Sequence, residues 1–179
     1  ADMDQWNFFL NKLKTAEKEV RIALVGKYVR LPDAYKSIIE SLIHASAYND
    51  RKLKLDLLLS DDITEDNVEA TLKGYDGILI APGFGERGIE GKIVSARYAR
   101  ENNIPTLGIC YGMQVMAIEF ARNVLGYKDA HTVEINPNAK HKVIDMMEEQ
   151  KTHLDKGGSM RLGAYACKLK AGSRAAEIY

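Results

Sequence analysis

One cysteine stands between two glycines in the segment Thr106-Leu-Gly-Ile-Cys-Tyr-Gly-Met-Gln114. Gly-x-Cys-x-Gly is the thiol counterpart of Gly-x-Ser-x-Gly, in which the nucleophile sits on a sharp turn between a strand and a helix. The flanking glycines permit that turn, and the positive end of the following helix favours the thiolate form of Cys110. Cys110 is therefore a candidate nucleophile. The alternative is a small apolar residue in the core, which is a common environment for cysteine, and the motif alone leaves both open.

A second glycine-rich segment, Gly83-Phe-Gly-Glu-Arg-Gly88, formally matches the dinucleotide fingerprint Gly-x-Gly-x-x-Gly. That fingerprint belongs to the first strand-to-helix turn and expects an acidic residue about 20 residues later. Here the segment follows the third predicted strand, and the next strand ends at Cys110. We favour a different interpretation, in which a backbone N–H of this loop and the amide of Tyr111 form an oxyanion hole. A flexible glycine turn with no further role is the alternative.

Strands and helices alternate regularly around these two segments. Apolar runs predict strands over residues 20–25, 53–59, 77–80 and 106–109. Helical spacing predicts helices over 34–47, 89–102 and from 114 onward, and a short helix, capped by Thr64, that contains Val68 and Leu72. The alternation predicts an α/β fold with a mainly parallel, doubly wound sheet and helices on both faces. Ligands of such sheets bind beyond the carboxyl ends of the strands, where the loops carrying Gly83 and Cys110 open.

The two ends of the chain differ from this pattern. Residues 1–19 predict a lead-in helix or linker, and residues 20–179 make up the domain. Beyond the helix after Cys110, short apolar runs and an alternating stretch over 157–168 predict an added β-rich C-terminal segment. Cys167 is expected to be a half-buried strand residue there.

Composition narrows the class of protein. The chain has 179 residues, 46% hydrophobic and 28% charged, which suits one globular domain. Its 25 basic and 25 acidic residues balance, which argues against nucleic acid or a membrane surface as a partner. It contains neither a run of ~20 apolar residues nor a signal-peptide pattern, so we expect a cytoplasmic protein. Two cysteines do not suggest a disulfide framework, and we expect no metal site.

Several motifs, in order from about Val20 to Tyr179, together resemble the class I glutamine amidotransferase domain of the CTP synthase family. They are Arg21-Ile-Ala-Leu-Val-Gly-Lys-Tyr-Val29, Asp33-Ala-Tyr35, Gly83-Phe-Gly-Glu-Arg-Gly-Ile-Glu-Gly-Lys92, Gly108-Ile-Cys-Tyr-Gly-Met-Gln114, Glu119-Phe-Ala-Arg-Asn-Val124 and Gly157-Gly-Ser-Met-Arg-Leu-Gly163. The resemblance implies a flavodoxin-like fold and a Cys-His-Glu hydrolase. Cys110 would attack the side-chain amide of glutamine, and the amides of Gly83 and Tyr111 would hold the oxyanion.

The resemblance also implies binding residues and partners. The residues that would contact glutamine are Gly83, Phe84, Tyr111, Gly112, Met113, Gln114 and Glu134, the last holding the substrate's ammonium group. The ammonia would pass to a synthetase domain that aminates UTP to CTP with ATP and magnesium, stimulated by GTP. No cofactor is expected in the amidotransferase domain itself. The family implies a homotetramer for the full-length enzyme.

Three departures from the family's pattern stand out. Pro82 replaces a usual glycine and Tyr111 a usual leucine, although both changes leave a backbone N–H at Gly83 and at Tyr111. The histidine and glutamate of the triad would lie beyond Tyr179, so we expect the 179-residue domain to be C-terminally incomplete and inactive alone. The histidines within it, none of which sits in a matching motif, are His44 on a helix and His131, His141 and His153 in polar loops. Two alternatives remain: a non-catalytic module for assembly or regulation, or the amidotransferase domain of another ammonia-using synthetase.

Overall fold

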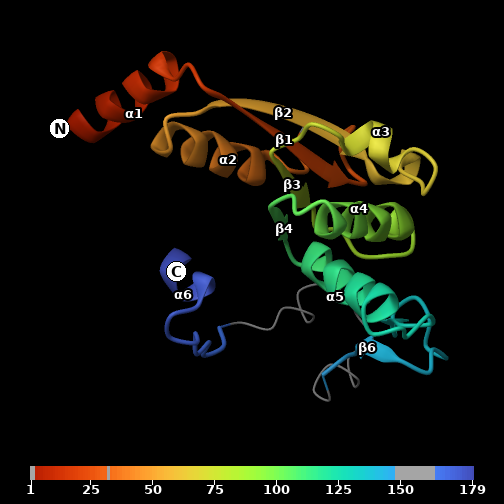
Figure 1. The fold of residues 1–179 in the computed structure, drawn as a ribbon. Helices are drawn as coiled ribbons and strands as arrows, with labels where there is room; N and C mark the ends of the chain where they lie inside the picture. Colours follow the sequence, from red (N-terminus) through yellow and green to blue (C-terminus); the bar gives the residue numbers. More distant parts are fainter. Residues whose placement is uncertain (1–2, 32, 148–163) are drawn as a thin grey trace. The chain divides into compact units, whose positions relative to one another are not determined.

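The computed structural model describes residues 3–31, 33–147 and 164–179 (Figure 1). The chain forms two compact units, Ala1–Asp145 and Met146–Tyr179. The elements of the first unit are α1 (Asp4–Thr15), β1 (Glu19–Gly26), α2 (Lys36–Tyr48), β2 (Lys52–Leu59), the 3-10 helix η1 (Ser60–Asp62), α3 (Val68–Leu72), β3 (Gly77–Ile80), α4 (Ile89–Glu101), β4 (Thr106–Gly108), α5 (Tyr111–Asn123), β5 (His131–Thr132) and β6 (Lys142–Ile144). The second unit contains α6 (Arg174–Ile178). No helix among the described residues is long and apolar enough to cross a membrane.

The main sheet has the strand order β2-β1-β3-β4, and every neighbouring pair is parallel. The register places Val25 beside Ile80 and Ile80 beside Gly108, so β1, β3 and β4 end at the same edge. The parallel sheet predicted from the alternation of strands and helices is confirmed. Its carboxyl edge carries the glycine-rich loop and the cysteine turn side by side.

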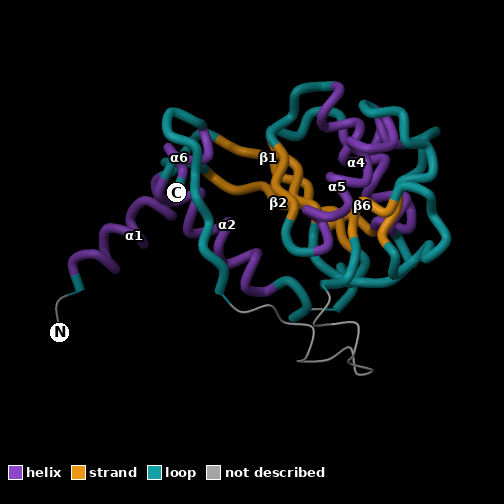
Figure 2. The backbone as a smooth tube through the Cα atoms, turned by 90° about the horizontal axis from the view of Figure 1, so that it is seen from below, coloured by secondary structure: helices purple, strands orange, loops and turns teal. Residues whose placement is uncertain are grey.

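Alternating side chains of the central strands pack against helices on both faces of the sheet. Ala23 and Ile78 belong to one buried cluster with residues of α3 and α4. Leu24 and Leu79 point the other way, into a cluster that α2 covers. In Figure 2, α2 lies on one side of the strands and α4 and α5 lie on the other. The doubly wound arrangement is therefore confirmed, and burial on both faces explains why these strands read as continuous apolar runs.

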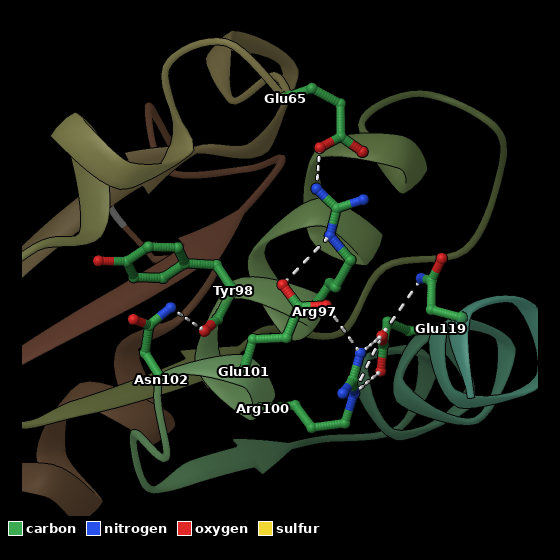
Figure 3. Close-up of polar contacts among 8 residues, drawn as sticks. Glu65, Arg97, Tyr98, Arg100, Glu101, Asn102 and Glu119 are labelled. Atoms are coloured by element: carbon green, nitrogen blue, oxygen red, sulfur yellow. Dashed lines mark hydrogen bonds and ion pairs between the residues drawn. The ribbon is translucent and has the colours of Figure 1, made fainter.

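Helix α5, which follows the cysteine, is joined to α4 by a partly buried ion pair (Figure 3). The Glu119 carboxylate is 2% exposed, and the Arg100 guanidinium binds it with Nη2 2.8 Å from Oε1. Arg100 Nε contacts both carboxylate oxygens at 3.1 Å. This two-pronged contact ties the C-terminal end of α4 to α5.

Two local predictions need correction. Thr64 is not a helix cap: α3 begins at Val68, and Asn67 occupies the cap position without a side-chain capping bond. The Asn67 amide instead bridges the turn, accepting from the Thr64 N–H at 2.9 Å and donating to the Asp62 carbonyl at 2.8 Å. Helix α5 begins at Tyr111, directly after Cys110, rather than at Gln114.

The predicted β-rich C-terminal segment is not confirmed. Strands β5 and β6 pair in parallel as a small separate sheet in the first unit. The alternating stretch 157–168 falls mainly on residues 148–163, outside the described residues. Its described part, 164–168, has no regular secondary structure, and Cys167 is exposed rather than half-buried in a strand. Alternation favours a strand only where a partner strand is present, and no described strand pairs with this stretch.

Candidate active site

The Cys110 backbone adopts a strained conformation at the turn from β4 to α5. Its φ of 55° and ψ of −112° are unusual for a residue with a side chain. Cys110 is also the N-cap residue of α5, and its carbonyl accepts hydrogen bonds from the amides of Met113 and Gln114 at 3.1 and 3.3 Å. The side chain is exposed, so Cys110 is not a filler of the apolar core. The turn presents a thiol to solvent at a helix N-terminus.

The two glycines of the cysteine motif are required by close packing. A Cβ on Gly112 would lie 2.0 Å from the carbonyl oxygen of Ile80 in β3. A Cβ on Gly108 would lie 2.6 Å from the backbone nitrogen of Met113. The first turn of α5 therefore rests directly on the ends of β3 and β4. Gly112, expected from the resemblance to contact glutamine, is buried in this contact.

The loop after β3 lies beside the cysteine turn. The amide of Ile109 donates to the Ile80 carbonyl at 3.1 Å, and the ring of Phe84 meets the ring of Tyr111 edge-on at 5.4 Å. Gly83 has φ +125°, a conformation that side chains rarely adopt. The predicted oxyanion donors, the amides of Gly83 and Tyr111, thus occupy neighbouring turns. Neither amide donates a hydrogen bond to another residue in the described ranges.

Three side chains that the sequence analysis did not single out hold the carbonyls of this loop. Lys92 Nζ donates to the Ala81 carbonyl at 2.8 Å and reaches the Pro82 carbonyl at 3.5 Å. The Tyr35 hydroxyl donates to the Pro82 carbonyl at 3.4 Å, and Lys27 Nζ donates to the Phe84 carbonyl. A signal for Lys92 was present, because it falls among Ile89, Ile93 and Ala96 on the apolar face of a predicted helix.

Lys92 is 1% exposed, and its ammonium group lies 5.7 Å from the centre of the Tyr111 ring. Its pKa is lowered to about 8, first by burial and then by the positive charge of Lys27. Negative charges on Cys110 and Asp61 act in the opposite direction. Two lysines and the cysteine therefore share one electrostatic environment.

The remaining residues expected to contact glutamine surround the same turn. Met113 and Phe84 are exposed, and Gln114 is partly exposed in the first turn of α5. Glu134 is exposed in the turn after β5. Burial, and secondarily the negative charge of Glu134, raises the pKa of the Tyr111 hydroxyl, which places that carboxylate within electrostatic range of Tyr111. The Tyr111 hydroxyl itself is buried with no hydrogen-bond partner among the described residues.

Two of the described histidines, His44 and His141, lie away from Cys110. His44 packs edge-on against Phe9 of α1, at 5.0 Å between ring centres. His141 binds Asp129 at 2.5 Å and stacks on Tyr127, which follows the C-terminal end of α5. A helix of 13 residues is about 20 Å long, so this pair lies at the far end of α5 from Cys110. The hydrogen bond to His141 helps lower the pKa of Asp129 to about 2.

His131 corrects the expectation of a solvated loop histidine. It forms part of β5 and is buried, and its Nδ1 accepts a hydrogen bond from the Thr132 amide at 3.0 Å. Burial, followed by the positive charge of Arg122, lowers its pKa, while Glu90 and Glu86 oppose the shift. His153 lies outside the described residues.

The Glutamine amidotransferase class-I family matches residues 30–178. The chain belongs to this family. The amidotransferase is 62% identical over 178 residues to a CTP synthase of Porphyromonas gingivalis, across 99% of this chain and 33% of the relative. It is 51% identical over 179 residues to the CTP synthase of Bacillus subtilis, across 100% of this chain and 34% of that relative.

A solved structure agrees with these sequence matches. The Trypanosoma brucei CTPS glutaminase domain with bound acivicin is similar with a TM-score of 0.68 and 39% identity, over 72% of this amidotransferase and 50% of that chain. This amidotransferase spans about a third of the length of the curated relatives that it matches. The fold predicted from the motifs is therefore confirmed as that of a class-I amidotransferase.

Proposed function

We propose that this domain hydrolyses glutamine through a thioester on Cys110 and supplies the ammonia for amination of UTP to CTP. The observation that carries the proposal is the juxtaposition at the carboxyl edge of the sheet. Cys110 has an exposed thiol and lies in a strained turn. The loop that carries Gly83 lies beside this turn, and the amides of Gly83 and Tyr111 donate no hydrogen bond to another described residue. This arrangement suits attack on a carbonyl group and stabilisation of the negative oxygen that results.

The reaction would proceed in two steps. The Cys110 thiolate attacks the side-chain carbonyl carbon of glutamine, and the carbonyl oxygen becomes an oxyanion held by the amides of Gly83 and Tyr111. The carbon–nitrogen bond then breaks, ammonia leaves after accepting a proton, and a glutamyl thioester remains. Attack by water releases glutamate and restores the thiol. The proton donor would be a group other than His44 and His141, since His44 packs against Phe9 of α1 and His141 lies with Tyr127 beyond the C-terminal end of α5.

Substrate orientation would come from the residues around the turn. We assign the ammonium group of glutamine to Glu134, whose carboxylate charge reaches Tyr111. Phe84, Met113 and Gln114 would line the path of the side chain, because all three are at least partly exposed beside Cys110. Gly112 would contribute indirectly, by letting α5 approach β3.

The steps after glutamine hydrolysis belong to the proposed synthetase domain of the natural protein. We assign ATP, UTP and magnesium to the synthetase domain and propose GTP as an activator. The names of the relatives support this assignment. A cytoplasmic homotetramer is the expected form of the full-length enzyme.

The test measures ammonia release and CTP formation in the natural full-length protein. We expect Cys110→Ala to abolish glutamine hydrolysis and glutamine-dependent CTP formation, but to leave CTP formation from added ammonium salt. Cys167→Ala is the matched control, because Cys167 is the other exposed cysteine, and it should leave both activities intact. Glutamine hydrolysis that persists in Cys110→Ala would refute the proposal, and absence of hydrolysis in the wild type would favour a non-catalytic module.

A further inference from the structure

Side-chain donors bind three carbonyl oxygens of the loop between β3 and α4, those of Ala81, Pro82 and Phe84. We propose that Tyr35 and Lys92 are positioning residues that fix the direction of the Gly83 amide, and so build the oxyanion hole from behind, while Lys27 holds the Phe84 carbonyl further along the loop. This inference rests on the proposed function, because it concerns the same reaction. It adds three residues, two from the connection between β1 and α2 and one from α4, to the machinery around Cys110.

Peptide planarity connects the held carbonyl to the catalytic amide. The carbonyl of Pro82 and the N–H of Gly83 belong to one trans peptide unit, in which the two groups point in opposite directions. Tyr35 Oη and Lys92 Nζ lie 3.4 and 3.5 Å from the Pro82 oxygen, respectively. Both therefore hold the carbonyl on one side and turn the Gly83 N–H to the other.

Glycine at position 83 makes it necessary to hold the Pro82 carbonyl in place. We call the two donors to this carbonyl, Tyr35 Oη and Lys92 Nζ, the clamp. Because glycine reaches φ angles on both sides of zero with little steric cost, the peptide before Gly83 can flip unless it is held. A Cβ on Gly83 would lie 3.0 Å from the Tyr28 ring and 3.1 Å from Lys27 Cε, so the surroundings leave little room for another residue. The hydrogen bonds to the Pro82 carbonyl restrain the flip that glycine would otherwise allow.

The donors of the clamp are themselves held firmly. Tyr35 is buried at the N-cap of α2, and its hydroxyl oxygen accepts a hydrogen bond from the Tyr28 amide at 3.2 Å. Lys27 is 7% exposed, and its carbonyl accepts from the Arg87 guanidinium at 2.9 Å. Arg87 also binds Asp61 at 3.1 Å. The loop is thus tied to the end of β1, to α2 and to α4.

The two lysines add charge as well as hydrogen bonds. Neither Lys27 nor Lys92 forms an ion pair with a carboxylate of the described residues, since both ammonium groups donate to backbone carbonyls. Two positive charges without a carboxylate partner beside Cys110 favour the build-up of negative charge on an oxygen there. Hydrogen bonds alone would hold the loop without any charge, so the positive charges of the two lysines would act on the oxyanion as well.

Two substitutions test the clamp in the natural full-length protein. Tyr35→Phe removes one donor to the Pro82 carbonyl and keeps the ring, and Lys92→Met removes the other with little change in length. We expect each to lower kcat for glutamine about tenfold while KM stays within about twofold. Lys73→Met is the matched control, because Lys73 is exposed at the end of α3, and it should change neither constant.

Alkylation of Cys110 by iodoacetamide separates positioning from general damage, since that reaction displaces iodide and develops no oxyanion. The clamp predicts an alkylation rate within about twofold of wild type in Tyr35→Phe, which changes no charge, together with the tenfold loss of glutamine turnover. Two results would overturn it: turnover within twofold of wild type in the folded variants, or alkylation of Tyr35→Phe that falls in proportion to its turnover. Failure of the proposed function is a different result, namely no Cys110-dependent hydrolysis in the wild type.

Discussion

Gly112 in the first turn of α5 touches the backbone of Ile80 at the end of β3, where an added Cβ would lie 2.0 Å from the carbonyl oxygen. This contact places the N-terminus of the helix, and therefore Cys110, directly over the neighbouring strand. Gly112→Ala should destabilise the domain by at least about 2 kcal/mol, because backbone has to move to admit the methyl group. Urea unfolding measures the change.

A second glycine provides the control for that substitution. Gly126 has φ +78° but nothing within 4 Å of its Cβ position. Gly126→Ala should therefore cost only the left-handed backbone conformation, about 1 kcal/mol. Equal decreases in the free energy of unfolding of the two variants would show that the close contact between Gly112 and Ile80 does not contribute to the destabilisation.

The ion pair between α4 and α5 predicts unequal effects for two neighbouring arginines. Arg100→Met would leave the buried Glu119 carboxylate without its guanidinium partner and should cost about 3 kcal/mol. Arg97 pairs with Glu65 and Glu101, whose side chains are 58% and 51% exposed, so Arg97→Met should cost less than about 1 kcal/mol. Chemical unfolding of both variants checks the ranking, and similar losses would contradict it.

The fold was largely predictable from the sequence because its pattern is local and repeated. The apolar runs include β3 and the second half of β1, which are buried on both faces. The glycines around Cys110 indicate the turn between β4 and α5. The predicted cap at Thr64 was wrong because serine, threonine, asparagine and aspartate are all favoured at the N-cap, and Asn67 lies directly before the helix. The predicted burial of Cys167 and the predicted exposure of His131 were wrong because burial depends on which distant segments cover a residue. The local sequence pattern does not contain this information.

Of the candidate site, motif and spacing predicted the two glycine-rich turns and the position of the Cys110 thiol between strand and helix, since these depend on chain geometry close in sequence. The catalytic role of Cys110 and the oxyanion role of the Gly83 and Tyr111 amides stay predictions. Lys27 and Tyr35 lie in the connection between β1 and α2, and Lys92 lies in α4, so they meet the loop after β3 only in the folded structure. A lysine in a helix is ordinarily expected to face solvent, so only its apolar neighbours pointed to burial.

The buried hydroxyl of Tyr111 predicts a stabilising substitution. Because this hydroxyl has no partner among the described residues, Tyr111→Phe should raise the free energy of unfolding by about 1 kcal/mol. Tyr35→Phe is the contrasting variant and should lower it by about 1 kcal/mol, since the Tyr35 hydroxyl bonds both Pro82 and Tyr28. Urea unfolding of both proteins gives the two signs, and a loss in Tyr111→Phe would reveal a partner for the Tyr111 hydroxyl.

Because of Lys92, the free energy of unfolding should change with pH in the alkaline range. Its folded-state pKa of about 8 lies below the ordinary value of 10.5, so between these pH values the unfolded chain binds more protons at this group. The free energy of unfolding should therefore rise with pH in this window, by up to about 3 kcal/mol relative to Lys92→Met. Unfolding at pH 7.5, 9 and 10 measures the difference. The control Lys73→Met should show no such change relative to wild type, and a difference that stays constant with pH in Lys92→Met would contradict the prediction.

The central claim is that glutamine becomes covalently attached to Cys110, and trapping the intermediate tests it most directly. Full-length protein turning over isotope-labelled glutamine is quenched in acid, digested and mapped by mass spectrometry. We predict a labelled glutamyl adduct on the peptide that contains Cys110, none on the peptide that contains Cys167, and loss of the adduct in Cys110→Ala. Glutamine hydrolysis without an adduct on Cys110, and undiminished in Cys110→Ala, would contradict the account.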